Sequence, residues 1–162
     1  MKIRRACGTI LFILLGMISL QTACTPLIDM GSTHTSGIDS LVLEFYSNRS
    51  WLKVGESVHL DFTVTNTGKR FIVVESKDKP VLDIIVQDMP SRQVLLSWAA
   101  QNPDKALHRV EWQPGESKAM ELVWTAPQEE YGRLIFLGGL LNENSKIAQS
   151  ANVSIYVGVT HP

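Results

Sequence analysis

The chain has 162 residues, with 15 Lys and Arg against 16 Asp and Glu, and 44% of its residues are hydrophobic. This length is typical of one domain, and the near-neutral charge excludes a nucleic-acid-binding protein, which needs clustered basic residues. The apolar share excludes an intrinsically disordered chain, because there is enough hydrophobic surface to form a core.

The N-terminal segment has the pattern of an export signal. Lys2, Arg4 and Arg5 precede an apolar stretch over residues 10–20. That stretch fits a secretory signal of roughly 7–15 apolar residues and is shorter than the roughly 20 that span a bilayer. We therefore predict a signal peptide over residues 1–23.

The sequence Leu20-Gln21-Thr22-Ala23-Cys24 resembles the lipobox of bacterial lipoproteins. The resemblance implies cleavage before Cys24 and attachment of diacylglycerol and an acyl chain such as palmitate, which would anchor the protein to the cell membrane or envelope. Cys7 lies within the signal, so lipidation would explain why Cys24 has no disulfide partner. Two alternatives stay open: a plain secretory cut, which leaves the protein secreted, and an uncleaved anchor helix.

Residues 24–39 are predicted to form a flexible tether. The segment consists mainly of Thr, Pro, Gly, Ser, His and Asp, has few apolar residues and shows no periodicity of apolar residues. His34 lies within it without a second histidine, so we interpret it as a solvated linker residue.

Residues 40–160 are predicted to form the folded domain. Apolar and polar residues alternate in short runs that are separated by turn residues, which is typical of β-strands. We predict an all-β fold, an antiparallel immunoglobulin-like Greek-key sandwich of about eight or nine strands. The runs lie at residues 41–45, 58–64, 71–74, 82–86, 94–98, 110–112, 120–124, 134–141 and 153–157.

Glycines and tryptophans refine this prediction. Gly-Glu-Ser at residues 55–57 and again at 115–117 predicts two similar turns that each lead into a strand. Gly138-Gly139 predicts a bulge or a hairpin kink. Trp98, Trp112 and Trp124 fall in apolar runs and are predicted to pack in the core. Trp51 lies in a polar connection, so it packs under the sandwich edge or, alternatively, is an exposed recognition anchor.

An ordered series of segments resembles the BsuPI-type intracellular proteinase inhibitor domain. The resemblance covers residues 57–157 and implies an immunoglobulin-like sandwich that inhibits a proteinase. It begins with a strand and an Asn-Thr turn typical of bacterial immunoglobulin-like domains. The segments are Leu60–Gly68, Val81–Asp88, Val94–Trp98, Trp112–Ser117 and Leu122–Trp124.

The sequence predicts neither catalysis nor a bound metal or cofactor. Ser97 lacks the Gly-x-Ser-x-Gly elbow of a nucleophile, so we do not expect a triad with His108. The four histidines lack metal-ligand spacing. Asp78, Asp83 and Asp88 lack the spacing of a calcium loop and are predicted to be solvated.

The sequence therefore predicts a membrane-anchored, non-catalytic protein-binding module whose partner is a protease or an envelope protein. The family resemblance favours a proteinase inhibitor, and a structural or assembly lipoprotein of the cell envelope without inhibitory activity is the alternative. Nucleic acid is not an expected partner, and the oligomeric state is not predicted.

Two polar connections are candidate binding segments, residues 99–106 and 141–146, although both also fit plain solvated connections. In the first, a proline limits the conformational freedom lost on docking. The candidate partner-binding residues there are Gln101, Asn102, Pro103, Asp104 and Lys105.

Overall fold

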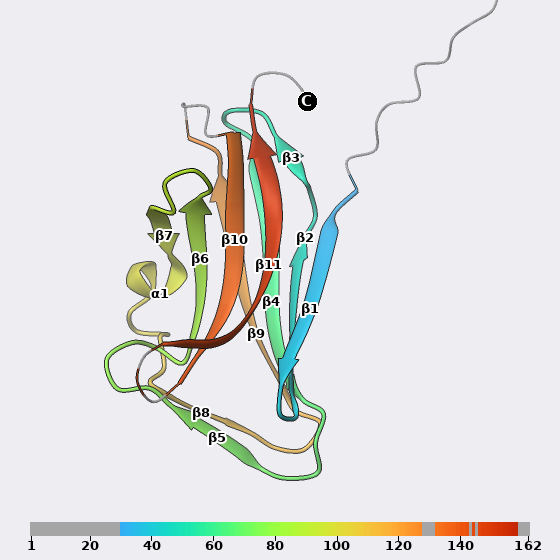
Figure 1. Cartoon of the computed structure of the whole chain (residues 1–162), viewed down its shortest axis with the longest axis vertical. Coiled ribbons are helices and arrows are strands. Elements are labelled where there is room, and N and C mark those ends of the chain that lie inside the picture. Colours follow the sequence, from blue (N-terminus) through green and yellow to red (C-terminus); the bar gives the residue numbers. More distant parts are fainter. Residues whose placement is uncertain (1–29, 128–131, 143, 145, 159–162) are drawn as a thin grey trace, which may run out of the picture.

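The computed structural model describes residues 30–127, 132–142, 144 and 146–158. Within these ranges the chain is almost entirely β-structure, with a single four-residue helix (Figure 1). The elements are β1 (Ser32–Ile38), β2 (Leu41–Ser47), β3 (Trp51–Leu52), β4 (Ser57–Asn66), β5 (Ile72–Glu75), β6 (Leu82–Asp88), β7 (Val94–Ser97), α1 (Trp98–Gln101), β8 (Arg109–Trp112), β9 (Ser117–Thr125), β10 (Gly132–Leu141) and β11 (Ile147–Val157).

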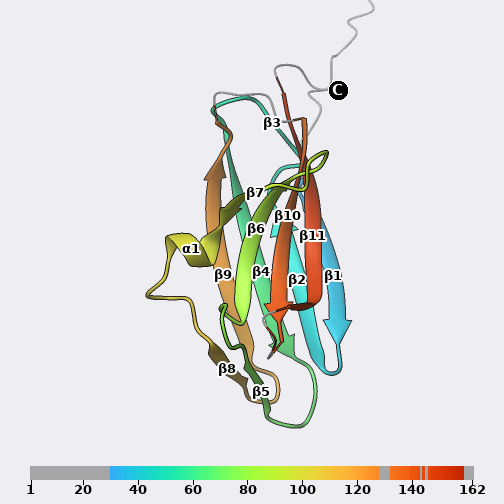
Figure 2. The same ribbon diagram turned by 60° about the vertical axis from the view of Figure 1, so that its left-hand side comes forward.

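Two sheets pack face to face, as the turned view shows (Figure 2). Sheet A has the strand order β1-β2-β4-β9, sheet B has the order β3-β11-β10-β6-β7, and β5 pairs with β8 in a small ribbon at one end. All these pairings are antiparallel except that of β3 with β11. The chain passes from sheet A at β4 to sheet B at β6, returns at β9 and crosses again to β10. This is the predicted immunoglobulin-like Greek-key sandwich.

The core lies between the sheets because side chains alternate along each strand. Phe45 and Phe62 of sheet A pack with their ring centroids 5.9 Å apart, and Trp124 of β9 meets Phe136 of β10 edge to face at 5.2 Å. Trp112 is fully buried, and its indole Nε1 donates to the carbonyl of residue 64 at 3.0 Å. The predicted core positions of Trp112 and Trp124 are therefore confirmed.

The nine predicted strand runs coincide with β2 and with β4 to β11. The strand β3 has only two residues, which is too short to show an alternation of apolar and polar side chains. The structure adds β1, β3 and α1 to them. The expected count of about eight or nine strands therefore rises to eleven among the described residues.

The predicted tether is wrong over residues 32–38, because this segment is strand β1. It pairs with β2 in continuous register from Ser32 opposite Ser47 to Ile38 opposite Leu41. Its side chains are mostly exposed, which is why no apolar pattern reveals it. His34 is not a linker residue, since its Nδ1 accepts a hydrogen bond from the Asn152 N–H at 3.2 Å.

The predicted signal peptide, Cys24 and the start of the predicted tether lie outside the described residues. In the part of the chain that the structure describes, no helix has the length and hydropathy needed to cross a membrane.

The two Gly-Glu-Ser turns are confirmed as equivalent entries into β4 and β9. Gly55 and Gly115 have φ angles of +83° and +78°, which a side chain would strain. In each turn the glutamate that follows accepts a hydrogen bond from a backbone N–H three residues earlier, Glu56 from Lys53 at 3.0 Å and Glu116 from Gln113 at 2.7 Å.

Gly138 provides space and does not form the predicted kink. It lies in the middle of β10, in regular register with both β11 and β6. A Cβ atom there would lie 2.3 Å from the Phe62 ring, so only glycine lets this core ring approach the strand. The irregularity in the β10–β11 register lies later, between Leu140 and Leu141.

Trp51 lies at the edge of sheet B, where β3 pairs with the end of β11. It is partly buried, and the Lys53 ammonium lies 5.9 Å from its ring centroid. Of the two interpretations of Trp51, the structure agrees with packing at the edge of the sandwich.

Candidate functional site: two grooves beside the α1–β8 connection

The short helix α1 turns the chain back after β7, and a serine begins it. Ser97 has an extended backbone, and its hydroxyl oxygen accepts a hydrogen bond from the Ala100 N–H at 3.2 Å. Asn102 ends the turn, because its backbone N–H and its side-chain amide both donate to the Trp98 carbonyl, each at 2.9 Å. Ser and Asn are favourable at such positions because their side chains satisfy backbone groups that a helix end leaves free.

Asp83 lies beneath this turn, and its predicted solvation is wrong. The residue is 7% exposed, on the face of β6 that points away from the core. Its two carboxylate oxygens accept hydrogen bonds from the Ser97 hydroxyl at 2.6 Å and from the Ala99 N–H at 2.9 Å. Burial raises the pKa of Asp83 above its ordinary value, and these hydrogen bonds oppose the rise. Asp83 thus ties β6 to the start of α1.

Ser97, Asp83 and His108 line one cavity, yet their hydrogen bonds are not those of a triad. The Ser97 hydroxyl donates to the carboxylate of Asp83. The His108 Nδ1 lies 3.3 Å from the Ser76 carbonyl. In a triad the histidine would stand between the serine and the carboxylate. The arrangement found here fits a structural cap.

The five candidate partner-binding residues have different surroundings. Gln101 and Asp104 are exposed and line neither of the two grooves described next. Asn102 and Lys105 line a groove that faces β9, whereas Pro103 lines a groove on sheet B. The predicted binding segment, residues 99–106, therefore lies between two grooves and contributes residues to both.

The first depression, the sheet-B groove, lies over the outward face of β6 and β7 and has a volume of about 770 Å³. Pro103 and Ala106 form one side, and Leu141, Lys146 and Ile147 of the β10–β11 hairpin form the other. The two connections that were predicted separately as binding segments thus line the same groove. Val94 and Ile147 contribute apolar surface, being 51% and 46% exposed.

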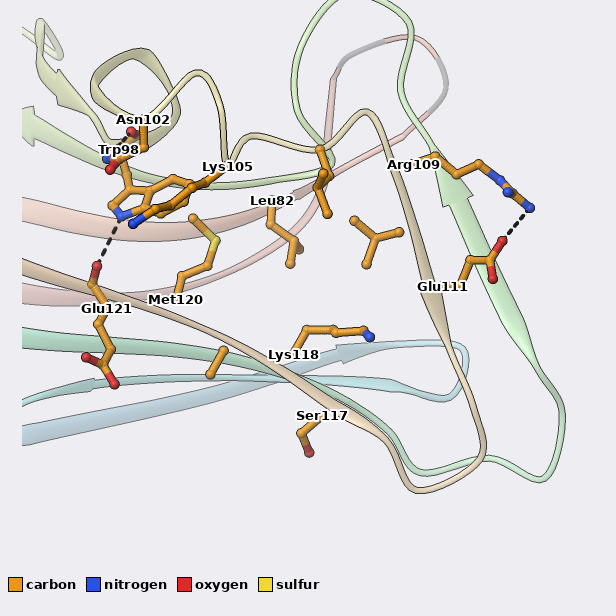
Figure 3. A pocket seen from close by; sticks show the side chains of 13 residues that line it. Leu82, Trp98, Asn102, Lys105, Arg109, Glu111, Ser117, Lys118, Met120 and Glu121 are labelled. Carbon is orange, nitrogen blue, oxygen red and sulfur yellow. Dashed lines mark hydrogen bonds and ion pairs between the residues drawn. The ribbon is translucent and has the colours of Figure 1, made fainter.

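The second depression, the indole groove, has a volume of about 800 Å³ and lies between α1, β8 and β9 (Figure 3). Trp98 spans it, and its Nε1 donates to the Glu121 carbonyl at 3.0 Å. This tryptophan is partly buried and packs against the core, so its predicted core position is only partly correct. Charged groups of both signs surround the indole groove, and the Arg109 guanidinium is already paired with Glu75 and Glu111.

Sequence reasoning missed Asp83 because a lone carboxylate in an alternating strand usually faces water. One signal was available. Leu82, Ile84 and Ile85 make β6 apolar on both faces, and such a strand is usually covered on both sides. An aspartate within such a strand is expected to be buried and paired.

Comparison with known proteins does not assign the chain to a family. No family model matches the chain. No curated protein matches it either.

Among solved structures, a CARDB domain from Pyrococcus furiosus aligns with 82% of this chain and 99% of its own, at 14% identity and a TM-score of 0.46. A β-glucosidase from Erythrobacter marinus aligns at 13% identity and a TM-score of 0.45, over 79% of this chain. One from Listeria innocua aligns at 16% identity and a TM-score of 0.42, over 80% of this chain. The aligned part covers 16% of each glucosidase.

Proposed function

We propose that this protein is a lipid-anchored, non-catalytic binding module that holds a protein partner in the sheet-B groove, and that the partner is a proteinase. The observation that carries the proposal is the meeting of two polar connections, far apart in sequence, on one groove with exposed apolar side chains. A rigid sandwich that presents loops around an apolar depression is a common design of binding domains. The resemblance to BsuPI-type inhibitors supports a proteinase as the partner class.

The composition of the groove fits an extended peptide segment of a partner. Val94 lies on the edge strand β7, and Ile147 begins β11, so both offer apolar surface beside backbone. Lys79 and Lys146 line the same groove together with the exposed Asp78, so its rim offers a partner charged groups of both signs. Apolar anchors within a polar rim are the usual arrangement of energetically important contacts.

The proposed lipid on Cys24 would hold the domain close to the membrane. Because β1 begins at Ser32, only residues 25–31 separate Cys24 from the sandwich. A fully extended chain over the eight steps from Cys24 to Ser32 spans at most about 29 Å, given about 3.6 Å per residue. The β10–β11 hairpin lies at the end of the molecule where β1 finishes (Figure 1). The hairpin side of the sheet-B groove would therefore lie toward the end of the molecule away from the anchor.

The anchor is tested by fractionation of cells that express Cys24→Ser. Lipid labelling should be lost and the protein should leave the membrane fraction, because Cys24 is the proposed attachment site. A protein that stays in the membrane with its signal intact would favour the uncleaved helix. A wild-type protein released from cells without lipid would favour plain secretion.

The binding function is tested with the full-length protein in detergent against a panel of serine, cysteine and metalloproteinases. Stoichiometric inhibition of one member supports the proposal. Uniform inactivity, with capture of a non-proteolytic protein from the cell envelope, would instead support the assembly lipoprotein.

The groove is tested on a confirmed partner with Ile147→Ser and Lys146→Glu. Each should weaken binding at least about tenfold, the effect of about 1.4 kcal/mol, because hot-spot residues commonly exceed that value. Val123→Ser is the matched control, since Val123 is 64% exposed and lies on the outward face of sheet A. Unchanged affinity in both groove variants, with melting temperatures within a few degrees of wild type, would place the site elsewhere.

A further inference from the structure

Three potential metal ligands meet on the outward face of sheet A, far from the sheet-B groove. They are His59 and Asp61 of β4 and Glu121 of β9, and one ligand atom of each lies within 4.8 Å of the other two. The cluster is invisible in the sequence, where 60 positions separate Asp61 from Glu121.

The strand register explains why these side chains meet. His59 and Asp61 are two residues apart on β4, so both point to the outward face. Asp61 is directly opposite Glu121 in the β4–β9 pair. The His59 Nε2 already lies 3.1 Å from Asp61 Oδ1.

The charges in the cluster favour a cation. Asp61 and Glu121 are directly opposite carboxylates, an arrangement that destabilises a sheet unless a positive group compensates it. Among the ion pairs of the described residues, no Lys or Arg pairs with either carboxylate, and His59 is the single basic partner. A divalent cation between them would remove the repulsion.

Neighbouring hydrogen bonds hold the backbone that carries two of the ligands in place. The His59 N–H donates to the Asn48 side chain at 2.9 Å, which fixes this part of β4 to the turn after β2. The Glu121 carbonyl accepts the Trp98 indole N–H at 3.0 Å, so the backbone that carries the carboxylate is fixed from the other side of β9 (Figure 3). Fixed backbones on both strands lower the cost of ordering a metal site.

We propose that His59, Asp61 and Glu121 bind a Zn²⁺ ion through one imidazole nitrogen and two carboxylate oxygens. These are ligand types that zinc accepts at about 2.0–2.2 Å. Ligands at that distance in a tetrahedron lie about 3.3 Å apart, so binding requires the three ligand atoms, now within 4.8 Å of one another, to come closer together. Three protein ligands leave a fourth position for water or for a donor from a bound molecule.

The experiment is isothermal titration of zinc chloride into the full-length protein in detergent. Any thiol of Cys7 or Cys24 that processing leaves free is blocked, so that no thiolate contributes. Wild type should bind one zinc ion. His59→Ala and Glu121→Gln should each weaken binding at least about tenfold, since loss of a group that merely supports a ligand already costs 10- to 100-fold. Both residues are at least partly exposed, so circular dichroism should show that the variants stay folded.

Two matched controls separate this site from general surface binding. Glu44→Gln removes an exposed carboxylate from the same face of sheet A, and His108→Ala removes a histidine at the sheet-B groove. Both should bind zinc as wild type does. A wild-type protein that gives no saturable zinc signal overturns the proposal. The proposal is equally overturned if the cluster variants and the control variants bind alike.

Discussion

The two lateral edges of the sandwich are closed by different means. At one edge β1 pairs along its whole length with β2 of sheet A, and its side chains reach sheet B. Ser36 Oγ donates to the Ser150 carbonyl at 2.7 Å, and His34 accepts the Asn152 N–H at 3.2 Å. At the other edge β9 and β7 do not pair. There the indole of Trp98, the first residue of α1 after β7, donates one hydrogen bond to the Glu121 carbonyl of β9.

The stabilising interactions are spread along the first edge and concentrated in a few residues at the second. A strand contributes many backbone hydrogen bonds, so one side-chain change there removes only a small part of the total. The second edge depends on Asp83, Ser97 and Trp98, which hold α1 and the connection after it. Both grooves lie at this edge. Its surface is therefore the one that single substitutions should alter most.

The largest expected effect at the second edge follows from Asp83→Ala. The change leaves the Ala99 N–H without its acceptor under the helix turn and removes the acceptor of the Ser97 hydroxyl. We expect a loss of about 3 kcal/mol in the free energy of unfolding, because a buried unsatisfied donor costs about 1–3 kcal/mol in addition to the lost hydrogen bond. Urea unfolding measures it. Asp104→Ala, at an exposed position of the same connection, is the control. Equal losses in the two variants would contradict the assignment.

Removal of residues 25–38 tests the first edge. If β1 belongs to the sandwich, the shortened protein should lose about 2 kcal/mol, because backbone hydrogen bonds of about 1 kcal/mol each are only partly offset by the freedom that the segment regains. Protein beginning near residue 40 would be fully stable if the segment were a tether. If the shortened protein has the same free energy of unfolding as the full chain, the segment would be a tether and not part of the sandwich.

The contrast between these edges also shows what the sequence can predict. Strands such as β4 have one buried and one solvated face, so alternation alone locates them. The β1 sequence is polar from Ser32 to Ser36, because most of its side chains face water. Its strand conformation is determined by the free edge of β2. Local pattern carries no information about a partner that lies elsewhere in the chain.

The candidate sites were predictable to different degrees. Composition located the connection with Pro103, because polar turn residues between apolar runs are a local feature. The shared groove with Ile147 and the approach of Asp61 to Glu121 depend on how distant strands pair. Only a register assignment, which a single sequence does not provide, would have revealed them.

Trp98→Phe tests the bridge at the second edge with a smaller expected effect. The aromatic packing is largely retained, while the hydrogen bond to the Glu121 carbonyl is lost. We expect a loss of about 1 kcal/mol, the usual net value of one hydrogen bond. Amide hydrogen exchange should increase in β9 near Glu121 and remain unchanged in β1. Faster exchange at both edges would mean that the indole stabilises the whole sandwich and not one edge.

The smallest expected effect is a pH dependence that comes from Asp83. Burial raises the pKa of this carboxyl above its ordinary value of 3.8, so the folded state holds its proton more tightly than the unfolded state does. The stability that Asp83 contributes is then largest at low pH and falls as the pH rises through the folded-state pKa. Asp83→Asn keeps an oxygen that can accept the Ala99 N–H but does not titrate.

The measurement is urea unfolding of wild type and Asp83→Asn at a series of pH values from about 3.5 to about 7, the range in which a raised carboxyl pKa acts. The stability of wild type relative to the variant should decline as the pH rises, while the other titrating groups cancel in the difference. Asp104→Asn controls for the loss of one charge. If the stability of wild type relative to the variant instead increased with rising pH, the hydrogen bonds from Ser97 and Ala99 would affect the pKa of Asp83 more than burial does. Asp83 would then act as a charged cap of α1 and not as a buried acid.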